Sequence, residues 1–236
     1  AGGKMFAQIW HCGRVAHAAL RADGSAPAGA SIKPAATQTM VPGPDGKPVP
    51  TDCGLPEALS LQEIHGVVGE FAHAAKLAMQ AGFDGVEIHG ANGYLLDQFR
   101  CPAVNNRNDA YGGTLANRYR LLLEVVDAVA AEVGPERIAV RQSPYGLGNG
   151  MVADPEPLKT YPWLARELNQ RGIGFLHIYC QTVDWIHDAT HSMMPALRDA
   201  FHGALIACGG FKTTAACEAI LARGHADLIA IGKPFI

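Results

Sequence analysis

Short apolar segments alternate with helical segments along most of the chain, and this alternation constrains the fold more than any other feature. Six runs rich in β-branched or aromatic residues each predict a strand: residues 5–10, 84–89, 137–142, 174–179, 204–210 and 227–233. Periodic stretches before four of these strands predict helices: residues 63–82, 115–134, 159–172 and 212–224. Strands that alternate with helices form right-handed βαβ units, so we expect an α/β fold with a parallel sheet.

The polar residues within these strands distinguish an open, doubly wound sheet from a closed (β/α)8 TIM barrel. Glu87 and His89 fall on one face of their predicted strand, opposite apolar neighbours, and Arg141 and His177 do the same on the next two strands. An open sheet covered by helices on both faces would leave these side chains without water or partners. The lumen of a barrel holds polar groups near its mouth, so the pattern favours the TIM barrel.

The number of strands indicates how much of a barrel is present. A closed barrel of this kind has eight strands, whereas we find about six, and the chain opens and closes next to a strand. We therefore expect a partial TIM barrel that lacks segments at both ends. With 236 residues, of which 48% are hydrophobic, we expect a single domain over residues 1–236.

Residues 20–57 interrupt the alternation of strands and helices. They are rich in Pro, Gly, Ala and Thr and show no periodicity, so we expect a long loop excursion within the barrel. Such a segment is either a functional cover of the site or a disordered linker, and the sequence leaves both alternatives open.

The composition argues against several classes of protein. Charged residues make up 17% of the chain, below the roughly 25% of an average soluble protein, and the formal net charge is -3. Proteins that bind nucleic acid or anionic membranes are usually more basic. The six cysteines form no C-x-x-C pair, so we expect neither a metal site nor a disulfide framework. No stretch has the pattern of a signal peptide or a membrane span, and we expect a cytoplasmic protein.

A polar cluster follows the second predicted strand, in the stretch VEIHGANGY. His89 ends the strand, and Asn92 and Tyr94 follow in a turn that contains glycine. Catalytic groups of TIM barrels lie at the carboxyl ends of strands. There, His89 and Asn92 can direct donors at one oxygen, and Tyr94 can supply a proton. We expect a catalytic site here, although each residue taken singly fits a capping or packing role as well.

Two further polar residues stand near strand ends and face the predicted lumen: Gln8 and Arg141. An arginine keeps its charge and is costly to bury alone, so Arg141 needs an anion or an electron-rich ring as its partner. Glu87 on the neighbouring strand is one candidate and a bound ligand is another. The sequence leaves these two alternatives open.

Glycines follow the last two predicted strands. Gly209 and Gly210 end the fifth, and Gly232 precedes Lys233 at the end of the sixth. Glycine lets backbone N–H groups approach a phosphate, and the last two loops of a TIM barrel are its usual phosphate site. We therefore expect these four residues to bind a phosphate, with Lys233 supplying the charge.

Several longer motifs resemble one family. They are AQIWHCGRVAH, GFDGVEIHGANGYLLDQF, NNRNDAYGGTLANRYRLLLEVVDAV, VRQSP, IACGGF and ADLIAIGKPFI, in this order. Together they resemble the Old Yellow Enzyme family of flavin-dependent ene-reductases over essentially the whole chain. The resemblance implies a TIM barrel that binds FMN non-covalently at its mouth. It also implies NADPH or NADH as the reductant and a small, electron-poor alkene as the substrate.

The resemblance gives each candidate residue a role. His89 and Asn92 match the pair that hydrogen-bonds the carbonyl or nitro oxygen of the alkene. Tyr94 matches the residue that protonates the α carbon when hydride reaches the β carbon. Gln8 matches the contact to the pyrimidine edge of the flavin, and Arg141 matches the cation beside the same ring system.

The resemblance also matches Gly209, Gly210, Gly232 and Lys233 to the phosphate site, where the family more usually has Arg in place of Lys. Arg100 and Cys101 depart from the family's usual residues near the barrel mouth, and the sequence gives them no role. A dienoyl-CoA reductase-like member of the superfamily and an inactive barrel fragment are the alternative functions. The physiological alkene, the choice of nicotinamide and the oligomeric state, including a homo-oligomer, cannot be read from the sequence.

Overall fold

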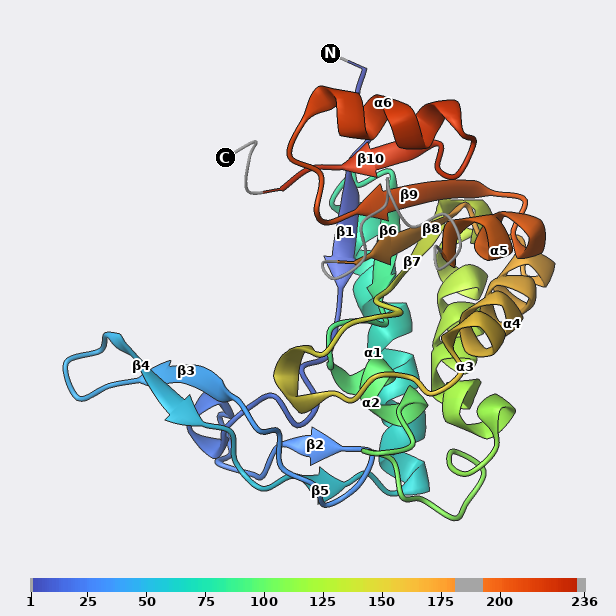
Figure 1. Cartoon of the computed structure of the whole chain (residues 1–236). Helices are drawn as coiled ribbons and strands as arrows, with labels where there is room; N and C mark the ends of the chain where they lie inside the picture. The colour runs from blue at the N-terminus through green and yellow to red at the C-terminus, as the bar shows by residue number, and fades with distance from the viewer. Residues whose placement is uncertain (1, 181–192, 233–236) are drawn as a thin grey trace.

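A parallel sheet of six strands is the centre of the structure, a computed structural model that describes residues 2–180 and 193–232. Its strands, in spatial order, are β1 (Phe6–Ile9), β6 (Gly85–His89), β7 (Ile138–Gln142), β8 (Phe175–Tyr179), β9 (Ala204–Cys208) and β10 (Leu228–Ala230). All six predicted strands are confirmed. Because the spatial order follows the chain order, the sheet has no reversal of the doubly wound kind. It is the partial TIM barrel that the sequence predicts (Figure 1).

The helices alternate with these strands. They are α1 (Leu61–Gln80), α2 (Leu95–Arg100), α3 (Leu115–Val133), α4 (Pro157–Gln170), α5 (Met193–Ala200) and α6 (Thr214–Ala222). Short 3-10 turns η1 (Ala18–Leu20), η2 (Pro135–Arg137) and η3 (Gly148–Gly150) complete the set. The four predicted helices are α1, α3, α4 and α6. In the described part of the chain, no helix has both the length and the apolar character to cross a bilayer.

Local sequence explains the longest helix. The Ser60 hydroxyl accepts from the Glu63 backbone N–H, and the Glu63 carboxylate accepts from the Ser60 N–H, so α1 begins with a capping box. Phe71 and Ala75 of α1 then lie in one buried core with Ile88 of β6. This burial on one face stabilises the helix against the sheet.

The short helix α2 was not predicted, because it lacks the pattern on which such predictions rest. All six of its residues, including Asp97, Gln98 and Arg100, are buried. A helix that is buried all round shows no polar face and therefore no amphipathic period. Helix α5 was not predicted either.

Residues 20–57, which we call the excursion, hold secondary structure that the sequence pattern did not predict. An antiparallel hairpin joins β3 (Gln38–Pro42) to β4 (Pro48–Asp52), and it projects away from the barrel sheet in Figure 1. A second, parallel pair joins β2 (Ala28–Gly29) to β5 (Glu57–Ala58) at the two ends of the excursion. The excursion is therefore built on its own strand pairs.

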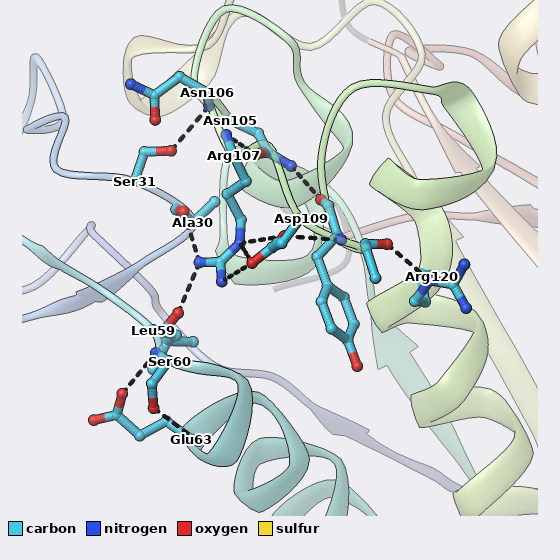
Figure 2. Close-up of polar contacts among 12 residues, drawn as sticks. Ala30, Ser31, Leu59, Ser60, Glu63, Asn105, Asn106, Arg107, Asp109 and Arg120 are labelled. Carbon is cyan, nitrogen blue, oxygen red and sulfur yellow. Dashed lines mark hydrogen bonds and ion pairs between the residues drawn. The ribbon is translucent and has the colours of Figure 1, made fainter.

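One arginine of the NNRNDAYGG motif holds the base of the excursion (Figure 2). The Nη1 atom of Arg107 donates to the carbonyl oxygens of Ala30, at 3.1 Å, and Leu59, at 2.7 Å. Its Nε and Nη2 atoms contact the Asp109 carboxylate, which fixes the plane of the guanidinium. Arg107 thereby links the two ends of the excursion to the loop that precedes α3.

Candidate active site

The turn after β6, residues 90–94, carries the predicted catalytic cluster and is held in an unusual backbone conformation. Asn92 has φ +58° and Gly93 has φ +78°, both in the left-handed region that asparagine and glycine tolerate best. The Asn92 N–H donates to Ser143 Oγ at 2.8 Å, and the Asn92 carbonyl accepts from Asn149 Nδ2 at 2.8 Å. Both partners lie in residues 143–156, which we call the β7 loop. We call residues 90–94 the β6 turn.

His89 and Tyr94 lie close together at the mouth of the sheet. Their ring centroids are 5.3 Å apart, and the Trp10 ring lies 6.4 Å from each of them. Trp10 was not singled out from the sequence. It follows β1 two residues after Gln8, so the same alternation that selected Gln8 would have indicated it.

Within residues 2–180 and 193–232, neither ring nitrogen of His89 has a hydrogen-bond partner, although the residue is only 4% exposed. Burial, and next the nearby Arg141 charge, lower the pKa of His89 from 6.5 to about 4. The imidazole is therefore neutral at neutral pH and offers one N–H donor. An orphaned donor in a buried site points to a ligand that supplies the acceptor.

A second cluster of polar side chains, Gln8, Glu87 and His177, lies across the lumen beneath this mouth. His177 Nδ1 lies 2.7 Å from Glu87 Oε2, and Gln8 Nε2 donates to Glu87 Oε1. Burial opposes the charge on both members of the His177–Glu87 pair. A hydrogen bond with Cys208, and next the bond with Glu87, nevertheless raise the pKa of His177, and the bonds with His177 and Gln8 lower the pKa of Glu87. The sequence did not predict this pair, because its members are 90 residues apart.

Arg141 does not take Glu87 as its partner. In the described residues no ion pair joins the two, and the guanidinium instead lies 5.1 Å from the centre of the Tyr179 ring. Its Nη2 atom is 3.8 Å from Cys208 Sγ, and its buried Nε atom has no partner in the part of the chain that the structure describes. The alternative of an internal Arg141–Glu87 pair is therefore wrong, because His177 already occupies the carboxylate. One edge of the arginine is left for a ligand.

The glycines after β9 adopt a left-handed backbone conformation that other residues rarely tolerate. Gly209 has φ +96° and Gly210 has φ +77°. A Cβ atom on Gly209 would collide with the Cys180 carbonyl oxygen, so this position admits no side chain. Gly232 follows β10, whereas Lys233 lies outside the described residues. The glycine backbone, the Arg141 edge and the His89 donor together suit an anionic, hydrogen-bonding cofactor.

Two cavities lie near this region. The smaller, about 260 Å³, is lined by Asn92, Tyr145, Leu147, Asn149, Tyr179 and two glycines, so it adjoins the catalytic cluster. The larger, about 590 Å³, lies between α1 and the excursion and includes none of the predicted site residues. We assign the candidate site to the smaller cavity, because Asn92 lines it together with Tyr179, whose ring lies against Arg141.

These features define a TIM-barrel protein whose candidate site lies at the carboxyl ends of its strands. The chain belongs to the NADH:flavin oxidoreductase / NADH oxidase family, because the model of that family matches residues 1–236. The resemblance to the Old Yellow Enzymes that the motifs indicated is confirmed.

Known relatives match the whole chain. It is 43% identical to 12-oxophytodienoate reductase 2 of Arabidopsis thaliana over 240 residues, covering 100% of this chain and 62% of the relative. Morphinone reductase superposes with a TM-score of 0.92 at 39% identity, covering 99% of this chain and 63% of that one. The old yellow enzyme homologue of Zymomonas mobilis superposes with a TM-score of 0.87 at 37% identity, covering 100% and 64%. The chain thus spans less than two thirds of these relatives.

The pKa values of the two lumen histidines should be shifted in opposite directions in the flavin-free protein. We expect the His89 ring to titrate near pH 4 and the His177 ring above pH 6.5. His89 would then lower the free energy of unfolding as pH falls from 6.5 towards 4, because only the unfolded state accepts its proton readily. The His177–Glu87 pair would stabilise the fold most between pH 4.5 and pH 6.5, which are the ordinary pKa values of glutamate and histidine. The contribution of His177 would be lost as pH rises through its raised pKa in the folded state.

NMR titration of the histidine ring protons measures both values. Variants His89→Gln and His177→Gln each remove one resonance and so provide the assignment. Midpoints near 6.5 for both rings would contradict the burial and pairing described above.

Proposed function

We propose that the protein is an FMN-dependent ene-reductase that draws reducing equivalents from NADPH or NADH. Its substrate is a small alkene conjugated to a carbonyl or nitro group. The whole protein carries this activity, of which the chain provides the catalytic turn and most of the strands around it. When bound, FMN supplies the hydride that adds to the β carbon of the alkene.

The observation that carries this proposal is the neutral, buried His89 with no partner on either ring nitrogen. With the Asn92 side chain, it would donate to the oxygen of the activating group. That oxygen gains negative charge as hydride adds, so donors placed at it stabilise the transition state more than the ground state. A neutral imidazole makes this hydrogen bond without losing a proton at neutral pH.

Tyr94 is the proposed proton donor to the α carbon. Its ring lies 5.3 Å from the His89 ring, so a substrate oxygen held by His89 brings the alkene within reach of Tyr94. A phenol is weakly acidic and stays protonated at neutral pH, which suits a group that must hold a proton until the carbanion forms.

Gln8 and Arg141 are proposed to hold the flavin ring. Because Gln8 Nε2 donates to Glu87, its carboxamide oxygen remains as an acceptor for an N–H of the pyrimidine edge. The buried, unpartnered edge of Arg141 supplies a positive charge that stabilises a reduced, anionic ring. The His177–Glu87 pair supports this assignment, since Glu87 has His177 as its direct partner and forms no ion pair with Arg141 among the described residues.

Gly209, Gly210, Gly232 and Lys233 are proposed to bind the FMN phosphate. Both glycines have the left-handed backbone that suits a loop around a phosphate, and the absence of a Cβ at Gly209 lets this loop pack closely on the Cys180 backbone. Lysine at the fourth position supplies charge without the bidentate contact of an arginine.

The names of the relatives support the substrate class. Oxophytodienoate reductase and morphinone reductase are both named as reductases of oxo compounds. A carbonyl group is the acceptor that the His89 donor requires.

The test is purification of the full-length protein and an anaerobic titration. We expect a yellow protein with one FMN, whose flavin is reduced by NADPH or NADH and reoxidised by cyclohex-2-enone. A colourless protein that takes up no added FMN, or a reduced flavin that no enone or nitroalkene reoxidises, would contradict the proposal.

A further inference from the structure

Arg100 lies buried at the centre of an ion triad with Asp97 and Asp154. Its Nε atom is 2.7 Å from Asp97 Oδ1 and its Nη1 atom is 3.0 Å from Asp154 Oδ2, and all three side chains are at most 2% exposed. Burial opposes the charge on the guanidinium, but Asp97 raises the pKa of Arg100 well above its ordinary value. Arg100 therefore keeps its charge, and the three members of the triad come from two separate parts of the chain.

One arm of the triad reaches the β6 turn. Asp97 Oδ2 accepts from the Gly93 N–H at 2.9 Å, and Gly93 lies between Asn92 and Tyr94. A carboxylate that accepts a backbone N–H forms a strong, charge-assisted hydrogen bond. Asp97 thus fixes the peptide that separates the two proposed active-site residues, while Arg100 fixes Asp97.

The other arm reaches the β7 loop. Asp154 lies near the end of this loop, where its Oδ1 atom accepts from the Glu156 N–H at 2.8 Å. Further back in the same loop, Ser143 and Asn149 bond the backbone N–H and carbonyl of Asn92. The contacts therefore form a closed ring that runs from Asn92 through Asp97, Arg100 and the β7 loop back to Asn92.

We propose that Arg100 is a positioning residue of the active site, whose bridge between Asp97 and Asp154 locks the β6 turn to the β7 loop and so fixes Asn92 for substrate binding. This inference rests on the proposed function and deepens it. It also gives a role to a residue for which the sequence alone suggested none. Arg100 touches no reacting atom in this arrangement; it acts through Asp97 and the turn.

The charges of the triad require a careful choice of variants. Removing Arg100 alone leaves two buried carboxylates without a cation, which destabilises a protein whatever the role of the arginine. A triple variant, Asp97→Asn with Arg100→Met and Asp154→Asn, removes all three charges together. It retains side-chain oxygens that can accept from Gly93 and Glu156, but it has no bridge. Asp97→Asn alone is the reference, because it makes the same change at Gly93 while Arg100 keeps Asp154 as its counter-ion. Any defect of the triple variant beyond this reference therefore reports the bridge.

The first measurement is hydrogen–deuterium exchange of the Gly93 amide by NMR, on the flavin-containing full-length protein. We expect exchange at Gly93 at least tenfold faster in the triple variant than in Asp97→Asn alone, with exchange in the core strand β7 changed less than about twofold. A general loss of stability would accelerate both sites together. A structural role without positioning would leave Gly93 at the rate of the Asp97→Asn reference once the charges are balanced.

The second measurement is a double-mutant cycle with Asn92→Ala, read as the rate of flavin reoxidation at saturating enone. We expect the triple variant to slow this step tenfold or more when Asn92 is present and less than twofold when it is Ala. An unchanged exchange rate at Gly93, or an additive cycle, overturns the proposal. If the protein binds no flavin or reduces no alkene, the proposed function fails, and Gly93 exchange in the flavin-free protein still decides whether Arg100 locks the turn.

Discussion

Replacing Tyr94 by Phe is expected to slow the reoxidation of reduced flavin by an enone by about 10²–10⁴-fold, which is the usual contribution of a general acid. The phenyl ring keeps the contacts with His89 and Trp10, whose ring centroids lie 5.3 and 6.4 Å away. Only the hydroxyl group is lost, and with it the proton that Tyr94 would donate. Reduction of the flavin by the nicotinamide transfers hydride alone and needs no proton from this residue, so its rate should change less than about threefold.

Stopped-flow absorbance at the flavin band separates the two half-reactions. Tyr111→Phe is a matched control, because the Tyr111 hydroxyl donates to Glu124 at 2.8 Å and lies in a different part of the fold. This control should leave both half-reactions near their wild-type rates. Equal slowing of the two half-reactions in Tyr94→Phe would show that the residue holds the site together and donates no proton.

The strand pattern predicted the barrel sheet because each strand carries its own local signal. Strands β6 and β7 alternate apolar and polar residues, and this period can be read without knowing any neighbour. The strands of the excursion carry no such signal. Two of them span only two residues each, Ala28–Gly29 and Glu57–Ala58, and β4 contains two prolines. Their pairing depends on contacts such as those of Arg107, which a local pattern cannot reveal.

The candidate site was likewise predictable only where a residue carries a local signal in the sequence. His89 and Arg141 were found because strand parity directs them into the lumen, and they stand on paired strands, Arg141 directly beside His89. The partner of each group was not predictable, because partners depend on register. Glu87 bonds His177 across an intervening strand, whereas Arg141 turns to Tyr179. Arg100 was singled out because it departs from the family's usual residue near the barrel mouth. Its role could not be read from the sequence, because its partner Asp154 is 54 residues away.

Arg107→Ala is expected to lower the free energy of unfolding by about 2–4 kcal/mol, because the variant loses several charge-assisted hydrogen bonds at once. The carbonyls of Ala30 and Leu59 would lose their donor, and Asp109 would lose its cation (Figure 2). Both carbonyls stand at the base of the excursion, so we expect residues 20–57 to open locally before the barrel sheet unfolds. Urea unfolding measures the global loss, and limited proteolysis measures the local opening.

Arg120→Ala provides the matched control for this experiment. Arg120 lies on α3 in the same region, where its Nε atom donates to the Ala110 carbonyl from an exposed position. Its removal should cost less than about 1 kcal/mol, since water replaces an exposed hydrogen bond readily. Faster cleavage within residues 20–57 in Arg107→Ala, but not in Arg120→Ala, would show that one guanidinium joins the excursion to the barrel. If the two variants behave alike, the excursion is held by its own strand pairs, and Arg107 only orders the loop before α3.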